Sequence, residues 1–126
     1  MGHKFLEPIQ IGSQTVKNRI IYLAMAKCYS GMDGSVSSRD VAYIESIAKG
    51  GVGIVIPGAM VIDPTWPSTL PMQPIINDDK YIPGLARLTD AAHKNGAKIL
   101  FQLWHPGQVD YSGGNPPTIN EMTVEQ

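Results

Sequence analysis

The sequence has little of what marks several other classes of protein. Its single cysteine, Cys28, leaves no disulfide within the chain, which favours a reducing compartment. Acidic and basic side chains nearly cancel to a net charge of −1, so no surface for nucleic acid or anionic lipid is expected. The chain lacks a signal-peptide pattern and any apolar run near the ~18 residues of a membrane-spanning helix. These absences predict a cytoplasmic protein without nucleic-acid or membrane partners.

What is present is the composition of a folded domain. The chain has 126 residues, of which 43% are hydrophobic and 17% charged, and this balance is typical of globular proteins. The length falls within the range of one domain, so residues 1–126 are expected to belong to a single domain.

Short apolar runs give the order of the strands. Residues 5–16 alternate loosely around Gly12-Ser13, which predicts a hairpin. Three later runs have the composition of strands buried in a parallel sheet: residues 20–25, 52–56 and 98–103. In the third of these, residues 99–101 are expected to be buried on both faces. Pro57-Gly58 is expected to leave the second strand, and residues 63–74, with four prolines, to form a long loop.

Two helices are expected between these strands. The first begins at a cap in Ser37-Ser38, with Asp40 at a capping-box position, and ends at Gly50-Gly51. The second begins at a cap within residues 77–79 and ends at Asn95-Gly96. Each has an apolar stripe that is expected to face the sheet. The stripes are Val41, Ile44, Ile47 and Ala48 in the first helix, and Ile82, Leu85, Leu88, Thr89 and Ala92 in the second.

The order strand, helix, strand, helix, strand builds a parallel sheet, either open and doubly wound or part of a barrel. Thr123 and Gln126 have capping-box spacing, which predicts the start of a third helix there. Two helices cannot cover both faces of a three-stranded parallel sheet. The predicted fold class is therefore α/β, a partial (β/α)8 TIM barrel with its first three strands, two helices and an N-terminal hairpin.

The carboxyl end of the third strand carries the residues of greatest functional interest. Ligands of parallel α/β proteins gather at this end of the strands. Gln102 and Trp104 have the same parity, so their side chains are expected to point the same way. A planar heterocycle with a donor and an acceptor on one edge would satisfy the amide of Gln102. Neighbouring backbone is the alternative partner, and the spacing does not decide between the two.

Other motifs argue against metal and phosphate chemistry. The glycines of residues 50–53 end a helix rather than open one, so no phosphate-binding loop is expected. His3, His93 and His105 lack the spacing of metal ligands, and no metal site is predicted. Cys28 has no His or Asp partner nearby in the sequence and is expected to pack as a small hydrophobic residue.

Four segments taken together resemble the Old Yellow Enzyme family of NADH:flavin oxidoreductases. They are NRIIYLAM (18–25), AKGGVGIVI (48–56), IPGLARLTDAAHKNGAKILFQLWHPG (82–107) and EMTVEQ (121–126). The resemblance implies the N-terminal portion of an FMN-binding (β/α)8 enzyme. It also implies NAD(P)H as the reductant and, as substrate, an activated alkene or enone that receives hydride through FMN. An iron–sulfur cluster and FAD would belong only to a longer parent protein.

The resemblance also implies roles for individual residues. The backbone of Ala24, Met25 and Ala26 would face the flavin near its reactive nitrogen. Ala59 would lie against the polar edge of the flavin ring, and Gln102 would hydrogen-bond its pyrimidine side.

Further positions correspond to the substrate pocket of the family. Trp104 and either Cys28 or Tyr29 would line it, and His105 would orient the loop after the third strand. The proton-relay pair and the phosphate anchor would lie beyond Gln126, so no catalytic residue is expected in this chain. The chain alone is therefore expected to be inactive and to hold FMN weakly.

Two positions depart from the family pattern. Ala24 stands where the family usually has proline. Ala26 stands where it commonly has threonine or cysteine, whose side chain bonds the flavin. Since alanine cannot donate this bond, a shifted flavin potential is expected in the intact enzyme. A redox titration that gave an Ala26→Thr variant the same potential would contradict this.

Two other functions fit the same residues. The chain could be an interaction module, because the open edge and uncovered faces of such a sheet would pair with another copy or with a missing C-terminal portion. It could also be part of a different barrel enzyme, such as a metal-free lyase, with Gln102 binding the substrate in place of flavin.

Overall fold

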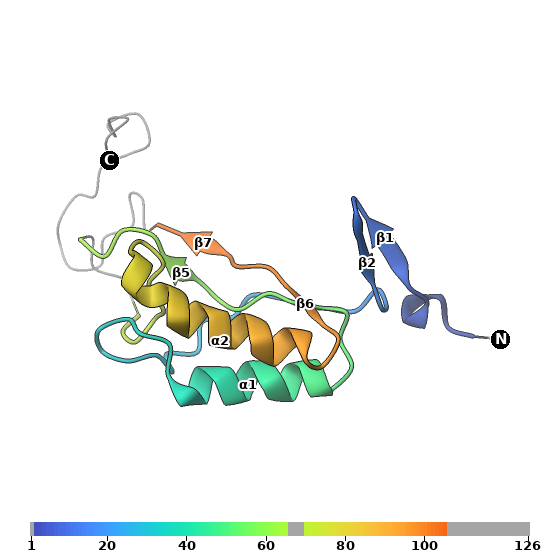
Figure 1. Ribbon diagram of the computed structural model, residues 1–126, viewed down its shortest axis with the longest axis horizontal. Helices are drawn as coiled ribbons and strands as arrows, with labels where there is room; N and C mark the ends of the chain where they lie inside the picture. The colour runs from blue at the N-terminus through green and yellow to red at the C-terminus, as the bar shows by residue number, and fades with distance from the viewer. Residues whose placement is uncertain (1, 66–69, 106–126) are drawn as a thin grey trace.

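The structure is a computed structural model that describes residues 2–65 and 70–105. A short 3-10 helix, Lys4–Leu6, precedes a hairpin of two antiparallel strands, β1 (Ile9–Ile11) and β2 (Gln14–Val16). Gly12, at the turn between them, has a φ of +56°, which glycine adopts without steric cost. The predicted hairpin is confirmed. In Figure 1 it projects from one end of the body formed by the helices and the remaining strands.

The body contains the parallel sheet that the sequence predicts. Strands β3 (Ile21–Tyr22), β4 (Ile54–Val55) and β6 (Lys98–Ile99) lie side by side in the order β3-β4-β6, and both pairs are parallel. The structure therefore bears out an α/β unit with parallel strands. The strands are shorter than the apolar runs from which they were predicted.

The second strand ends before Pro57-Gly58, as predicted, but the chain does not leave the strands for long. The chain resumes as β5 (Met60–Val61), which pairs in parallel with β7 (Leu103–Trp104). The Met60 amide donates to the Gln102 carbonyl at 2.8 Å. Proline has no amide hydrogen for a ladder, so Pro57 interrupts the pairing without ending the strand direction. Just after the expected long loop, Ile75 forms a parallel bridge with Val61 of β5.

Helix α1 (Ser38–Lys49) has the predicted ends. Ser37 caps it, and the full capping box with Asp40 is formed. Gly51, just after the helix, has a φ of +97°, as a glycine stop requires. Helix α2 (Ile82–His93) begins less directly, because Asp78 caps a short 3-10 turn, Asp79–Tyr81, that leads into it.

The core lies between the two helices and one face of the strands. Its buried members are Val36, Ile44, Ala48, Val55, Met60, Leu85, Leu88, Ala91, Ala92 and Ala97. The α1 stripe is confirmed. In α2 the expectation for Ile82 is wrong, since this residue is 56% exposed, whereas Ala91 is buried. At 100° per residue the buried stripe is centred near Leu88, and Ile82 falls about 120° away, outside it.

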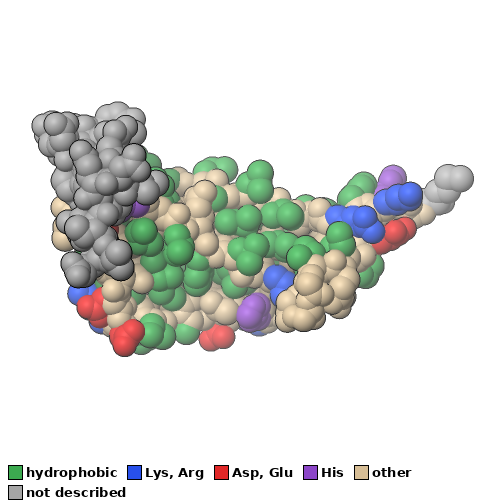
Figure 2. Space-filling view, turned by 90° about the horizontal axis from the view of Figure 1, so that it is seen from above, with side chains coloured by type: hydrophobic (Ala, Val, Ile, Leu, Met, Phe, Trp, Pro, Cys, Tyr) green, Lys and Arg blue, Asp and Glu red, His purple; other side chains and the backbone are tan. Residues whose placement is uncertain are grey.

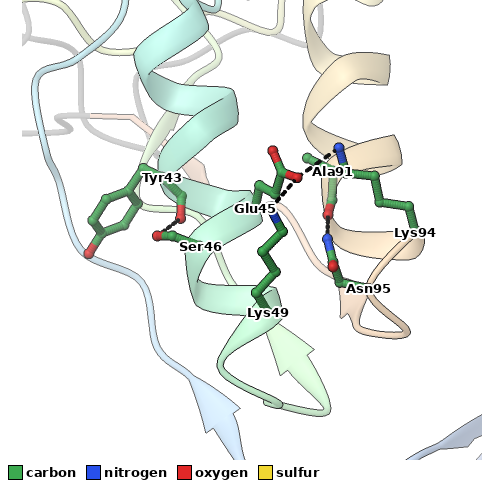
Figure 3. A network of polar contacts seen from close by, with 7 residues as sticks. All are labelled: Tyr43, Glu45, Ser46, Lys49, Ala91, Lys94 and Asn95. Carbon is green, nitrogen blue, oxygen red and sulfur yellow. Dashed lines mark hydrogen bonds and ion pairs between the residues drawn. The ribbon is translucent and has the colours of Figure 1, made fainter.

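Exposed polar contacts join the two helices on their outer side (Figure 3). The Glu45 carboxylate in α1 lies 2.8 Å from Lys49 Nζ and 3.0 Å from Lys94 Nζ, which follows α2. These contacts, the one with Lys49 first, hold the pKa of Glu45 below its usual value. Since both lysines are exposed and Glu45 is only partly buried, the pairs add little to stability.

The other face of the strands is uncovered. Leu23, Leu100 and Leu103 are 67%, 55% and 62% exposed, and Figure 2 shows hydrophobic side chains gathered on this side of the molecule. The expectation of burial on both faces of residues 99–101 is therefore wrong at Leu100. Ile99 and Phe101 pack against the core, but the two helices lie only on that side.

For the predicted third helix and the absence of a membrane-spanning helix, only the described residues can be considered. The capping signal at Thr123 and Gln126 lies outside the described residues. Within the described ranges, no helix is both long enough and apolar enough to cross a bilayer.

Candidate functional site at the carboxyl ends of the strands

The segments that follow β3 and β4 come into direct contact. A Cβ built on Gly58 would overlap the carbonyl oxygen and carbon of Met25 and lie 2.7 Å from the Ala26 nitrogen. The φ of Gly58 lies outside the left-handed region, so the requirement here is for space. Glycine at position 58 allows the two strand ends to touch.

A cavity of about 30 Å³ lies at this contact. It has room for one or two water molecules but not for a flavin ring. Five of the eight predicted site residues are among those that line it: Met25, Ala26, Cys28, Tyr29 and Ala59. The structure therefore brings together residues from two strand ends that are more than thirty positions apart in the sequence.

The other three predicted residues lie nearby in the fold but do not line this cavity. Ala24 is half-buried just after β3. Gln102 is exposed, and its carbonyl accepts the Met60 amide at 2.8 Å. Trp104 is half-buried in β7.

The side chain of Gln102 lies outside the helix-covered core. It forms no hydrogen bond to any residue in the described ranges, so those residues do not support the alternative in which neighbouring backbone satisfies its amide. An exposed amide at a strand end leaves a donor and an acceptor available to a ligand.

A cluster of aromatic and cationic residues lies at the cavity, and of its members only Tyr29 was predicted as a site residue. The hydroxyls of Tyr22 and Tyr43 are 2.6 Å apart, and this hydrogen bond, together with burial, raises the pKa of Tyr43 to about 12. Lys27 Nζ lies over both rings, and the Arg39 guanidinium lies 3.9 Å from the ring centre of Tyr29. The alternation of side chains along the predicted first strand could have placed Tyr22 on the side that faces the helices.

The loop after β3 is tied to the start of α1. Asp40 accepts hydrogen bonds from the Ser37 amide at 2.9 Å and from Ser30 Oγ at 3.0 Å. The Ser37 hydroxyl also donates to the Tyr29 carbonyl at 2.7 Å. Cys28, in this loop, is half-buried and has a φ of +54°, which is uncommon for a residue with a side chain. The helix cap thus also fixes the segment that lines the cavity.

His105 and Asp63 meet at the same end of the strands. Their closest atoms, Nε2 and Oδ2, are 3.8 Å apart. Asp63 Oδ1 accepts from the Thr65 hydroxyl at 2.6 Å and the Thr65 amide at 2.9 Å. The hydroxyl bond is the main reason that the pKa of Asp63 lies below its usual value, with His105 a smaller contribution. The predicted loop-orienting role of His105 stays a prediction.

No cluster of potential metal ligands occurs in the part of the chain that the structure describes. The arrangement is instead one of small side chains, exposed backbone and an amide at the carboxyl ends of consecutive parallel strands. This is the edge at which α/β proteins of the barrel type bind small organic ligands.

Comparison with known proteins identifies the family. The chain belongs to the NADH:flavin oxidoreductase / NADH oxidase family, which it matches over residues 4–116. It is 37% identical over 104 residues to the NADH oxidase of Thermoanaerobacter brockii, an alignment that covers 82% of this chain and 16% of that protein. The resemblance to the Old Yellow Enzyme family is thus confirmed.

Solved structures show the same relationship. The old yellow enzyme from Trypanosoma cruzi matches with a TM-score of 0.72 and 31% identity, over 83% of this chain and 28% of that one. A 2-naphthoyl-CoA reductase matches with a TM-score of 0.80 and 30% identity, over 86% of this chain and 16% of that one. The chain therefore spans less than a third of each of these relatives. The family that the chain matches is one of flavin oxidoreductases.

Proposed function

We propose that this chain forms one side of the flavin site in an FMN-dependent NAD(P)H oxidoreductase of the ene-reductase type. The observation that carries the proposal is the meeting of Met25, Ala26 and Ala59 at the carboxyl ends of two paired parallel strands. When bound, FMN supplies hydride transfer from NAD(P)H to an activated alkene or enone. A cytoplasmic location belongs to the same proposal, in keeping with the single Cys28.

The residues at this edge suit a flat, polar-edged ring. Ala26 and Ala59 have the smallest side chains after glycine, so backbone can approach a ring closely at both positions. The Ala26 amide donates no hydrogen bond to any residue in the described ranges, and it is therefore available to an acceptor on the ring. The exposed amide of Gln102 can both donate and accept, which fits the pyrimidine side of a flavin. Ala24 would contribute backbone only.

The substrate side of the site would be formed by Cys28, Tyr29 and Trp104. Tyr29 is held from two directions, by Arg39 over its ring and by an edge contact to Tyr43 at 5.7 Å between ring centres. A ring fixed in this way can shape a pocket without moving when a ligand enters. The proton relay and the phosphate anchor are expected beyond Gln126, so this chain alone is expected to bind FMN weakly and to turn over no substrate.

A titration with two flavins tests the proposal. FMN and riboflavin differ in the phosphate group, whose anchor is expected outside this chain. Both should therefore perturb the flavin spectrum with affinities that agree within about twofold, well below the 1.4 kcal/mol of a tenfold change. The variant Gln102→Leu should weaken both equally, and Lys49→Met, on the outer side of α1, should weaken neither. No spectral change with either flavin would contradict the proposed site.

Gel filtration tests the expected weakness of binding. FMN should separate from the 126-residue chain on the column, because no phosphate contact is expected within it. A flavin spectrum that eluted with the protein would overturn this part of the proposal.

A second function is favoured by a separate observation, the exposed apolar face of the strands. Leu23, Leu100 and Leu103 lie on this uncovered side, and contiguous exposed apolar surface marks interaction sites. This face would be covered by another copy of the chain or by a polypeptide carrying the remaining strands of the barrel. Sedimentation of the purified chain tests the first partner: a monomer at all concentrations would rule out self-association.

A further inference from the structure

Lys27 lies where the two strand-end segments meet. Its Nζ donates a hydrogen bond to the carbonyl oxygen of Met25 at 2.6 Å. The same Nζ lies 4.8 Å from the ring centre of Tyr43 and 5.3 Å from that of Tyr22. A cation is attracted to the negative face of an aromatic ring. The ammonium group is thus held by one carbonyl and two rings at the same time.

The rings that hold Lys27 are themselves fixed. Tyr22 comes from β3 and Tyr43 from α1, and the hydrogen bond between their hydroxyls joins the strand to the helix. Both rings pack against the buried core. The position of the ammonium is therefore set by the core and not only by the flexible lysine side chain.

The Met25 carbonyl is also limited by the neighbouring strand. Since a Cβ on Gly58 would overlap it, the backbones are already in close contact at this point. The Met25 oxygen therefore lies against Gly58 and is hydrogen-bonded by Lys27. The two contacts restrict rotation of the peptide group that joins Met25 to Ala26.

Fixing this carbonyl also fixes the next amide. A peptide group is planar and trans, so the N–H of Ala26 points opposite to the C=O of Met25. This amide donates to no other residue in the described ranges, and Ala26 is exposed. It is a hydrogen-bond donor with a preset direction.

We propose that Lys27 is a positioning residue, which orients the Met25 to Ala26 peptide so that the Ala26 N–H is presented to an acceptor atom of the flavin ring. The identity of the acceptor rests on the proposed function, but the orientation of the peptide does not. Lys27 acts through this peptide and needs no contact with flavin or substrate.

Nuclear magnetic resonance on the flavin-free chain tests the orientation. Lys27→Met should change the carbonyl carbon shift of Met25 and the amide shift of Ala26, because the charged donor is lost. Lys27→Arg should restore most of both shifts, since arginine keeps the charge and the donors. Lys49→Met is the matched control and should change neither, because Lys49 pairs with Glu45 on the outer side of α1. Unchanged α2 amide shifts identify folded variants.

The orientation role would be overturned if a folded Lys27→Met variant left the Met25 carbonyl shift within the range seen for Lys49→Met. Recovery in Lys27→Arg separates loss of the donor from loss of side-chain bulk.

A second titration, with FMN added, tests whether the oriented Ala26 amide binds the flavin. The Ala26 amide of the wild-type chain should shift with FMN, and Lys27→Met should weaken the apparent affinity by up to about tenfold, as for a bond to a charged group. Equal responses in the two chains would overturn the positioning of the donor for flavin. No response in the wild type, together with an intact Lys27→Met effect on Met25, would contradict the proposed function and leave the orientation role standing.

Discussion

The two faces of the parallel strands differ although the same strands form both. On one face Val55 and Met60 are fully buried in the core that the strands form with α1 and α2. On the other, Leu23, Leu100 and Leu103 are more than half exposed. Because side chains alternate along a strand, each strand contributes to both faces. Apolar composition alone therefore does not show which side chains are buried; the covering elements decide it.

The two faces also differ at the carboxyl ends of the strands. The covered side continues there as the Tyr22, Tyr43 and Lys27 cluster, which holds the loop after β3 against α1. The open side continues as the exposed Gln102 and Ala26. The proposed flavin site is thus an open surface supported from behind by a packed one.

A pair of leucine truncations gives the largest expected difference between the faces. Leu88→Ala, at a side chain 2% exposed in the core, should lower the free energy of unfolding by about 2–5 kcal/mol. Leu103→Ala, at a side chain 62% exposed, should change it by no more than about 0.5 kcal/mol. Urea unfolding of both variants measures the two values. Equal losses would mean that the open face is buried in solution, by self-association or by other contacts.

Local rules predicted the helices and the hairpin well. Ser37 with Asp40, and Gly51 after the helix, are short-range signals that act through backbone hydrogen bonding, and the structure has both. Burial was predicted less well. The apolar run around Leu100 predicts a core residue. Its side chain is exposed because, among the described residues, no helix packs on that side of the strands.

The position of the candidate site could be predicted from the sequence, but the contacts that hold its backbone in place could not. The order of the elements placed the strand ends together, and five predicted residues line one cavity there. The contact between Gly58 and Met25 depends on distances between separate strands, which no local pattern encodes. Lys27 was missed for the same reason, since its partners Tyr22 and Tyr43 lie on a strand and a helix.

An added methyl group at Gly58 should have a smaller effect than the Leu88 truncation. Gly58→Ala would place a Cβ in the Met25 carbonyl, and the shift needed to relieve it should cost about 1–3 kcal/mol. Gly2→Ala is the control, because nothing lies within 4 Å of the added atom, and it should cost nothing measurable. Thermal unfolding measures both. A neutral Gly58→Ala would show that the two strand ends are free to separate, which would remove the close contact on which the site depends.

The smallest expected effect is a fall in the free energy of unfolding at alkaline pH, caused by Tyr43 on the helix-covered side of the strands. The Tyr22 hydroxyl, with burial, raises the pKa of Tyr43 from 10.0 to about 12, so the folded state favours the neutral ring. The resulting stabilisation is complete below pH 10 and is lost as the pH rises to about 12, because the unfolded chain releases this proton first. Tyr22→Phe should return the pKa of Tyr43 toward 10, as followed by absorbance at ~295 nm with Tyr43→Phe to assign the signal. If the titration is the same in both backgrounds, Tyr22 and Tyr43 are not bonded in solution, and the packed support behind the open site is looser than their 2.6 Å separation indicates.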